Sequence, residues 1–232
     1  MRFIKQKLKF KVDAVDNASG SNRKRHGHLL PDSIRCLIVG PSNCGKTNLM
    51  ICLLENENGL RYRNIYVYSK SLQQPKYEYL KKLMGQVSGI GYFPFAENQE
   101  VIAPHDARPD SIFIFDDIAC ENMNAVRRYF SMGRHARVDS FFLCQSYTRV
   151  PKHLVRDNAN LLFVFQQDAL NLKHIFDDHV GSDMNFSTFH RLCRSCWGKE
   201  VFGHLIIDKD SPINTGRYRC GLDTYIHLDP DD

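Results

Sequence analysis

The sequence predicts an α/β fold, with a mainly parallel β-sheet and helices on both of its faces. Short apolar runs rich in β-branched and aromatic residues alternate along the chain with segments of helical spacing, which is the pattern of parallel sheets. A glycine-rich loop, GPSNCGKT at 40–47, joins the first apolar run to the first helical segment. Several apolar runs end in polar residues, and parallel sheets bind ligands beyond the carboxyl ends of their strands. We therefore expect a ligand site at that edge of the sheet.

The first half of the chain contributes three expected strands and two expected helices. IRCLIV at 34–39 is short, apolar and β-branched, which predicts a buried strand, and KTNLMICLLE at 46–55 has helical spacing. NIYVY at 64–68 predicts a second strand. PKYEYLKKLM at 75–84 predicts a helix with proline in its first turn. IGYFPF at 90–95 predicts a short strand, and its Pro94 favours a position at the sheet edge.

The second half repeats the alternation. SIFIF at 111–115 is the strongest strand signal in the chain. The remaining expected elements are a helix at 121–132, a strand at 140–144, a helical turn at 151–156, a strand at 160–165, two helical segments between 168 and 193, and a last sheet strand at 200–207. We expect an irregular tail after Asp208.

Composition indicates a reduced, intracellular protein. Hydrophobic residues make up 43% of the 232 residues and charged residues 25%, and a chain of this length can bury a full core without disulfides. The eight cysteines fall partly inside apolar runs, which argues against a secreted disulfide framework. No apolar run is long enough to span a bilayer, and the first twelve residues lack the apolar segment of a signal peptide. We therefore expect no membrane contact.

Charge divides the chain unevenly. Residues 1–28 hold eight lysines and arginines against two aspartates, a local charge of +6, whereas the whole chain carries +5. The rest of the chain is therefore close to neutral. We predict a basic N-terminal arm and linker at 1–29, a main domain at 30–210, and a C-terminal tail at 211–232.

The loop at 40–47 matches G-x-x-x-x-G-K-[ST], the phosphate-binding loop of P-loop nucleoside triphosphatases. Gly40 and Gly45 allow torsions and close approaches that a Cβ would block, so the loop N–H groups can surround a phosphate. Lys46 would sit beside the β- and γ-phosphate oxygens, and the Thr47 hydroxyl would bind Mg²⁺. The residues expected to contact ATP are Gly40, Pro41, Ser42, Asn43, Cys44, Gly45, Lys46, Thr47 and Asn48. A chance match, and a loop that binds nucleotide without hydrolysing it, are the alternatives.

Polar residues at two strand ends complete the predicted site. IFIFDD at 112–117 ends in Asp116, expected to hold Mg²⁺, and Asp117, expected to act as the base that polarises the attacking water. SFFLCQS at 140–146 ends in Gln145, expected to sense the γ-phosphate or orient the water. The simpler alternatives are an acidic turn or helix cap for the aspartates and an ordinary strand end for the glutamine.

An arginine could stabilise transition-state charge from a neighbouring subunit. The candidates are Arg134, Arg137, Arg149 and Arg156, with Arg134 first, and a solvated surface charge is the common role of any single arginine. His190, Cys193 and Cys196 have spacings compatible with zinc, with His204, Cys220 or His227 as a fourth ligand. Because no second C-x-x-C exists, buried reduced thiols are the favoured interpretation.

The combination of GPSNCGKT, IFIFDDI, GRHARVDSFFLCQS and LLFVF resembles the FtsK/HerA superfamily. Within it the chain is most similar to the poxvirus-type genome-packaging ATPases, with relatives in large DNA viruses, virophages and virus-like Maverick/Polinton or adintovirus elements. The resemblance spans residues 30–210 and implies a RecA/ASCE-like P-loop NTPase fold. It also implies a hexameric or pentameric homo-oligomeric ring that uses ATP and Mg²⁺ to pump double-stranded DNA into a preformed capsid.

Residue by residue, Gly40, Gly45, Lys46 and Thr47 match the family's phosphate loop, Asp116 and Asp117 its acidic pair, and Gln145 its sensor. Many members carry Asp-Glu where this chain has Asp-Asp, which weakens the assignment of the base. The resemblance further implies capsid proteins as partners, and a location in the host nucleus, a cytoplasmic viral factory or the virion.

Two questions stay open at this point. The basic arm could contact DNA phosphates without reading sequence, or it could be a solvated tail or a nuclear import signal, since RKRH at 23–26 can serve as one. The chain could also be a small-molecule phosphotransferase, although no lid segment with several arginines is evident. A nucleotide-binding module without catalysis is the third class, which the intact Lys46, Thr47 and acidic pair disfavour.

Overall fold

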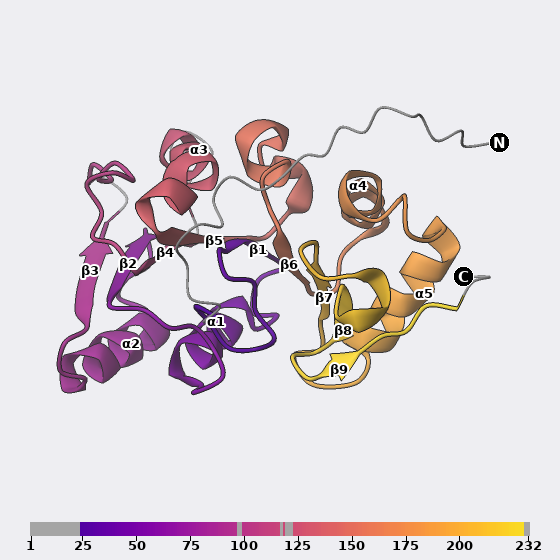
Figure 1. Cartoon of the computed structure of the whole chain (residues 1–232), viewed down its shortest axis with the longest axis horizontal. Coiled ribbons are helices and arrows are strands. Elements are labelled where there is room, and N and C mark those ends of the chain that lie inside the picture. The colour runs from indigo at the N-terminus through magenta and orange to yellow at the C-terminus, as the bar shows by residue number, and fades with distance from the viewer. Residues whose placement is uncertain (1–23, 97–98, 117, 119–122, 230–232) are drawn as a thin grey trace, which may run out of the picture.

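A computed structural model describes residues 24–96, 99–116, 118 and 123–229. In this part of the chain nine strands form one sheet (Figure 1). The strands are β1 Arg35–Val39, β2 Asn64–Ser69, β3 Gly91–Phe95, β4 Ser111–Asp116, β5 Val138–Cys144, β6 Leu161–Val164, β7 Leu205–Asp208, β8 Tyr218–Cys220 and β9 Thr224–Tyr225. Their order across the sheet is β3-β2-β4-β5-β1-β6-β7-β8-β9.

The first six strands are parallel, and the last three continue the sheet antiparallel. Parallel neighbours need crossover connections, and helices supply most of them here. The helices are α1 Lys46–Glu55, α2 Pro75–Gln86, α3 Met123–Met132, α4 Ala169–His179 and α5 Phe186–Trp197. A 3₁₀ helix at Gly133–Ala136, another at Tyr147–Arg149, a π-helix at Lys152–Arg156 and a 3₁₀ helix at Ile213–Thr215 complete the set. The predicted α/β fold with a mainly parallel sheet is therefore confirmed.

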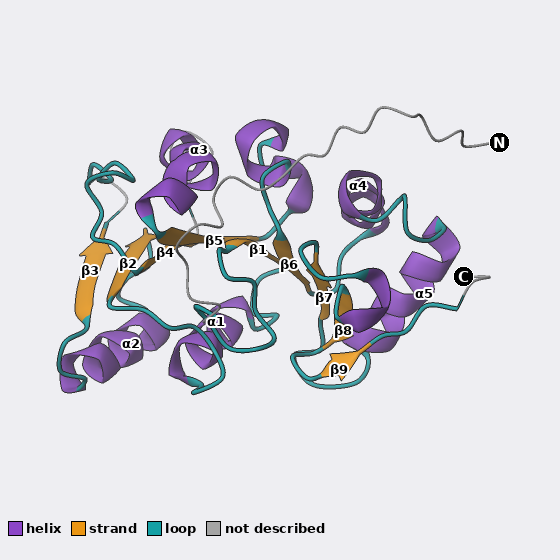
Figure 2. Ribbon diagram, viewed as in Figure 1, coloured by secondary structure: helices purple, strands orange, loops and turns teal. Residues whose placement is uncertain are grey.

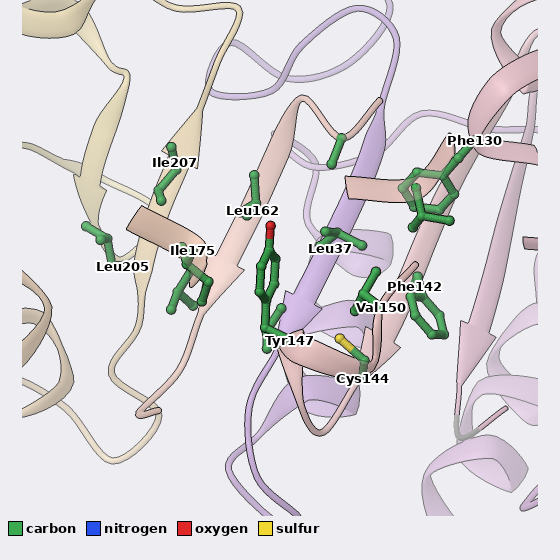
Figure 3. Close-up of a cluster of buried hydrophobic side chains, with 14 of the residues drawn as sticks. Leu37, Phe130, Phe142, Cys144, Tyr147, Val150, Leu162, Ile175, Leu205 and Ile207 are labelled. Carbon is green, nitrogen blue, oxygen red and sulfur yellow. The ribbon is translucent and has the colours of Figure 1, made fainter. Parts of the chain in front are cut away.

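Helices cover both faces of the sheet (Figures 1 and 2). Helices α1 and α2 lie on one face, and α3 and α4 on the other. Each strand divides its side chains between the two faces: in β1, Cys36 and Ile38 belong to the core beneath α1 and α2, and Leu37 and Val39 to the opposite core. Figure 3 shows part of this second core. Side chains of β1, β5, β6 and β7 lie there together with Phe130 of α3 and Ile175 of α4.

Local chemistry fixes where the helices begin. Pro75 occupies the first turn of α2, as the sequence predicts. The side chain of Asp168 accepts a hydrogen bond from the Asn171 N–H at the start of α4. Asn185 caps α5 in the same way through the Thr188 N–H.

The end of the chain differs from the sequence prediction. The expected strand at 200–207 is wrong in its first half, because β7 begins only at Leu205. Val201 is 92% exposed and lies in a turn, and a Cβ at Gly203 would lie 2.5 Å from the Cys196 carbonyl oxygen. Strand β7 is not the last strand, and the segment after Asp208 is not irregular throughout, since β8 and β9 extend the sheet. The division of the chain at residues 29 and 210 stays a prediction.

A buried carboxylate fastens residues 24–34 to the amino ends of the strands. The side chains of Asp139 in β5 and of His26 are fully buried, and Asp139 Oδ2 lies 3.0 Å from His26 Nε2. The Arg61 N–H donates to His26 Nδ1 at 3.1 Å, so Nε2 is the nitrogen that donates to Asp139. Asp139 also accepts the Ile34 N–H at 2.7 Å and pairs with Arg25 Nη2 at 3.1 Å. This network lies at the amino ends of the parallel strands, opposite their carboxyl ends.

Among the described residues, no helix combines the length and the apolar character that a bilayer crossing requires.

Candidate functional site

The glycine-rich loop connects β1 to α1 at the carboxyl edge of the parallel strands. Two of its residues, Asn43 and Gly45, adopt positive φ, at 62° and 110°. A Cβ at Gly40 would lie 2.5 Å from Cys44 Sγ and 2.6 Å from Phe165 Cβ. A Cβ at Gly45 would lie 2.6 Å from the ring of Phe202. Gly45 is therefore required by its positive φ, and both glycines by the close packing of neighbouring side chains against the loop.

Lys46 is the first residue of α1, where the unpaired N–H groups and the helix dipole favour an anion. Its ammonium group donates to the carbonyl oxygens of Gly40 at 2.7 Å and Pro41 at 2.8 Å. The positive charge thus lies over the mouth of the loop. The first turn of α1 contains no acidic residue that would oppose a bound phosphate.

A cavity of about 450 Å³ opens beside the loop. The ends of three neighbouring parallel strands reach it: Thr47 follows β1, Asp116 ends β4 and Gln145 follows β5. The structure thereby brings these three predicted site residues together. Asp117, predicted as the base, lies outside the described residues. Ser42, Asn43, Gly45 and Lys46 line the cavity as well.

Cationic side chains outnumber carboxylates in the described part of the cavity wall. Lys46, Lys70, Lys76 and Arg149 line it, and Asp116 is the one carboxylate among the described lining residues. This balance suits a polyanion that carries a divalent cation with it. Lys70 and Lys76 flank the connection between β2 and α2, to which sequence reasoning gave no role. Their place in the site could have been predicted, because this connection also begins at the carboxyl end of a parallel strand, where such sheets bind ligands.

Asp116 is held by two neighbours. The buried Tyr77 hydroxyl donates a hydrogen bond to its Oδ2, and Thr47 Oγ1 lies 3.5 Å from the same oxygen. A hydroxyl and a carboxylate oxygen are hard ligands, of the kind that Mg²⁺ prefers. Thr47 and Asp116 therefore fit the divalent ion that a nucleoside triphosphate carries.

The candidate arginines occupy different parts of the molecule. Arg149 lines the cavity, in the 3₁₀ helix that follows β5. Arg134 belongs to the 3₁₀ helix that precedes β5, so it lies near the amino end of that strand, and Arg137 pairs there with Asp110 at 2.6 Å. Arg156 donates to Asp178 at 2.8 Å and lies over the Tyr147 ring, which gives it a packing role. Within one chain, Arg134 does not reach the cavity, and its action in a neighbouring subunit stays a prediction.

The cysteines near the end of the chain are packed thiols. Cys193 and Cys196 lie on the buried side of α5, His190 is exposed, and Cys196 hydrogen bonds to Cys220 of β8. Burial raises the pKa of Cys193 and Cys196 far above the usual range, so both thiols keep their protons. In the part of the chain that the structure describes, no three His, Cys, Asp or Glu residues gather as a metal site.

Comparison with known proteins places the fold. No protein-family model matches the chain, and no curated protein matches it. The chain is similar to the solved structure of the genome packaging NTPase B204 from Sulfolobus turreted icosahedral virus 2 in complex with AMP. The TM-score is 0.52 and the identity 14%, over 77% of this chain and 94% of that one. It is also similar to B204, the DNA-packaging ATPase from Sulfolobus Turreted Icosahedral Virus, with a TM-score of 0.50 and 15% identity over 78% and 94% of the chains. At this identity the likeness shows a shared fold, which agrees with the fold that the sequence motifs imply.

Proposed function

We propose that this chain binds ATP with Mg²⁺ in the cavity beside the glycine-rich loop, hydrolyses it, and uses the energy to move double-stranded DNA into a capsid. One observation carries the first part: Lys46, Thr47, Asp116 and Gln145 line a single cavity at the carboxyl ends of adjacent parallel strands. A lone loop motif does not require that arrangement, whereas a hydrolytic site does.

The residues would divide the work by position. The N–H groups of the loop and of the first turn of α1 would bind the phosphates, and Lys46 would turn from the Gly40 and Pro41 carbonyls to the phosphate oxygens. Thr47 and Asp116 would hold Mg²⁺, which supplies Lewis-acid neutralisation of phosphate charge. Gln145 would orient the attacking water, and Asp117 would accept its proton.

The DNA-motor part has separate support. The FtsK/HerA-like motifs, the fold shared with proteins described as genome-packaging NTPases, and the +6 charge of residues 1–28 favour it over other ATPase classes. Arg25 and His26 contact Asp139 at the amino ends of the strands, opposite the cavity. Residues 1–23 of the basic arm lie outside the described residues. In this proposal the basic residues of the arm contact DNA phosphates, and capsid proteins receive the DNA. Arg134, near the amino end of β5, would serve the next subunit of a homo-oligomeric ring.

Steady-state ATP hydrolysis with and without double-stranded DNA tests the proposal. We expect hydrolysis that DNA stimulates and that Lys46→Ala lowers about 100-fold or more, because the lysine contacts charge in the transition state. Lys82→Ala is the matched control: Lys82 is exposed on α2 and does not line the cavity, so it should behave as wild type.

Other outcomes separate the alternatives. Transfer of phosphate from ATP to a nucleoside monophosphate would favour a phosphotransferase. ATP binding without Lys46-dependent turnover, under any DNA condition, would indicate a nucleotide-binding module and refute the motor.

A further inference from the structure

Two tyrosines of α2 donate their hydroxyls to carboxylates, and they differ in burial. Tyr77 is 2% exposed and donates to Asp116 at the cavity. Tyr79 lies two residues further on, is 50% exposed, and donates to Glu55 at the end of α1. The first bond reaches the carboxylate that fits Mg²⁺, and the second stays at the protein surface.

The position of Tyr77 is fixed from several sides. It lies in the first turn of α2, where its N–H donates to the Gln74 carbonyl oxygen at 2.9 Å, and its ring belongs to the core beneath α1 and α2. The Ser69 hydroxyl also hydrogen bonds to the phenol. Ser69 of β2 pairs with Asp116 of β4 across the sheet. Ser69, Tyr77 and Asp116 therefore form one hydrogen-bonded row at the carboxyl edge of the strands.

The chemistry of the two groups gives the direction of the bond. The Tyr77 hydroxyl donates its proton, and the Asp116 carboxylate oxygen accepts it. Asp116 Oδ2, the oxygen that accepts, is also the one that lies 3.5 Å from Thr47 Oγ1.

We propose that Tyr77 is a positioning residue for the magnesium site: it holds the Asp116 carboxylate in the orientation that faces Thr47. This inference rests on the proposed function, because it assigns Tyr77 a part in binding the Mg²⁺ that accompanies ATP. A carboxylate fixed by a buried donor loses little freedom when it engages the ion, and partners of this kind commonly change metal affinity 10- to 100-fold. Tyr77 is not among the residues that line the cavity, so the phenol would act on the site only through Asp116.

Magnesium titration of nucleotide binding tests this role. The probe is a fluorescent ATP analogue, and half-saturating free Mg²⁺ is measured for wild type, Tyr77→Phe and Tyr79→Phe. Tyr77→Phe keeps the ring in the core and removes one hydroxyl. Tyr79→Phe removes a hydroxyl from the same helix, α2, but this hydroxyl bonds a different carboxylate, that of Glu55 in α1. Binding of the analogue in EDTA and thermal unfolding are recorded for all three proteins.

The expected result is that Tyr77→Phe needs about 10-fold more Mg²⁺, with unchanged binding in EDTA and an unchanged unfolding temperature. Tyr79→Phe should match wild type. A magnesium requirement of Tyr77→Phe equal to that of wild type would overturn the inference and leave the proposed function intact. Equal weakening with and without Mg²⁺, together with a lower unfolding temperature, would assign Tyr77 a packing role only and would also overturn it. If wild type shows no magnesium-dependent binding at all, the proposed function itself fails.

Discussion

Removal of the Asp139 side chain should cost a large share of the stability of this protein while leaving the nucleotide site intact. Asp139 is fully buried in β5 and accepts the Ile34 N–H at 2.7 Å and the His26 Nε2–H at 3.0 Å. Asp139→Ala would leave both donors buried without an acceptor, and each orphaned donor costs about 1–3 kcal/mol. The partner Arg25 retains 22% side-chain exposure, so water can partly replace the carboxylate there.

We therefore expect a loss of about 3–5 kcal/mol in the free energy of unfolding, the usual range when one partner of a buried pair is removed. A domain of this kind has about 5–15 kcal/mol in total. Trp197 is the only tryptophan of the chain, so its fluorescence during urea unfolding reports the transition directly. Asp139→Asn, which keeps the size and one acceptor for the Ile34 N–H, should lose less than Asp139→Ala.

The matched control is Asp177→Ala. Asp177 pairs with Lys173 at 2.6 Å on the surface of α4, with half of each side chain exposed, and such pairs are worth about 0.5 kcal/mol or less. Nucleotide affinity, measured below the onset of unfolding, should be unchanged in Asp139→Ala because Asp139 lies at the opposite sheet edge. A loss below about 1 kcal/mol would refute the reasoning, since two buried donors cannot remain unpaired at so small a cost.

Three further predictions follow from the site and from the core. Gly45→Ala should weaken nucleotide binding about 10-fold or more, measured by fluorescence titration, because a φ of 110° strains any residue with a Cβ and the new methyl would meet the Phe202 ring. Bound ATP should slow the labelling of Cys44 in the loop by maleimide, while exposed Cys52 on α1 stays reactive as the control. Peptide mass spectrometry measures the labelling of each cysteine. Equal labelling of Cys44 with and without ATP would argue against a nucleotide at this loop. Burial lowers the pKa of His179 to about 3 in the folded chain. Between pH 6.5 and pH 3 the unfolded chain therefore binds a proton at this histidine and the folded chain does not. The free energy of unfolding should fall as the pH drops from 6.5 toward 3. His179 should contribute a slope of about 1.4 kcal/mol per pH unit to the free energy of unfolding. The difference between wild type and His179→Gln, in urea unfolding series at each pH, measures this contribution.

Local patterns in the sequence were enough to predict most of the sheet and the loop. Strands such as β4 and helices such as α1 carry their own periodicity, and the loop at 40–47 carries its own torsional demands, so no distant contact is needed to recognise them. The grouping of Asp116 and Gln145 at one edge could also be predicted, because parallel strands place their carboxyl ends together.

The parts that sequence did not predict depend on distant contacts. Tyr77 reads as one apolar position of a helix, and only the fold brings its hydroxyl to Asp116, 39 residues away. Asp139 looks like a polar strand start, yet its partner His26 lies 113 residues earlier. Val201 and Phe202 resemble a strand because they are apolar, but the packing of Gly203 against the end of α5 keeps them in a turn. Strands β8 and β9 are too short to show any periodicity.

The two margins of the sheet restrict how copies of this chain can associate. Strand β3 forms one margin, and its Pro94 has no N–H, so a row of donors that another chain could use is interrupted. The other margin is β9, which has only two residues. Fusion of sheets from two molecules, the usual route to fibrous aggregation, is therefore disfavoured at both margins of the described sheet. Two copies of this chain would therefore associate through side-chain contacts, without backbone hydrogen bonds between their sheets.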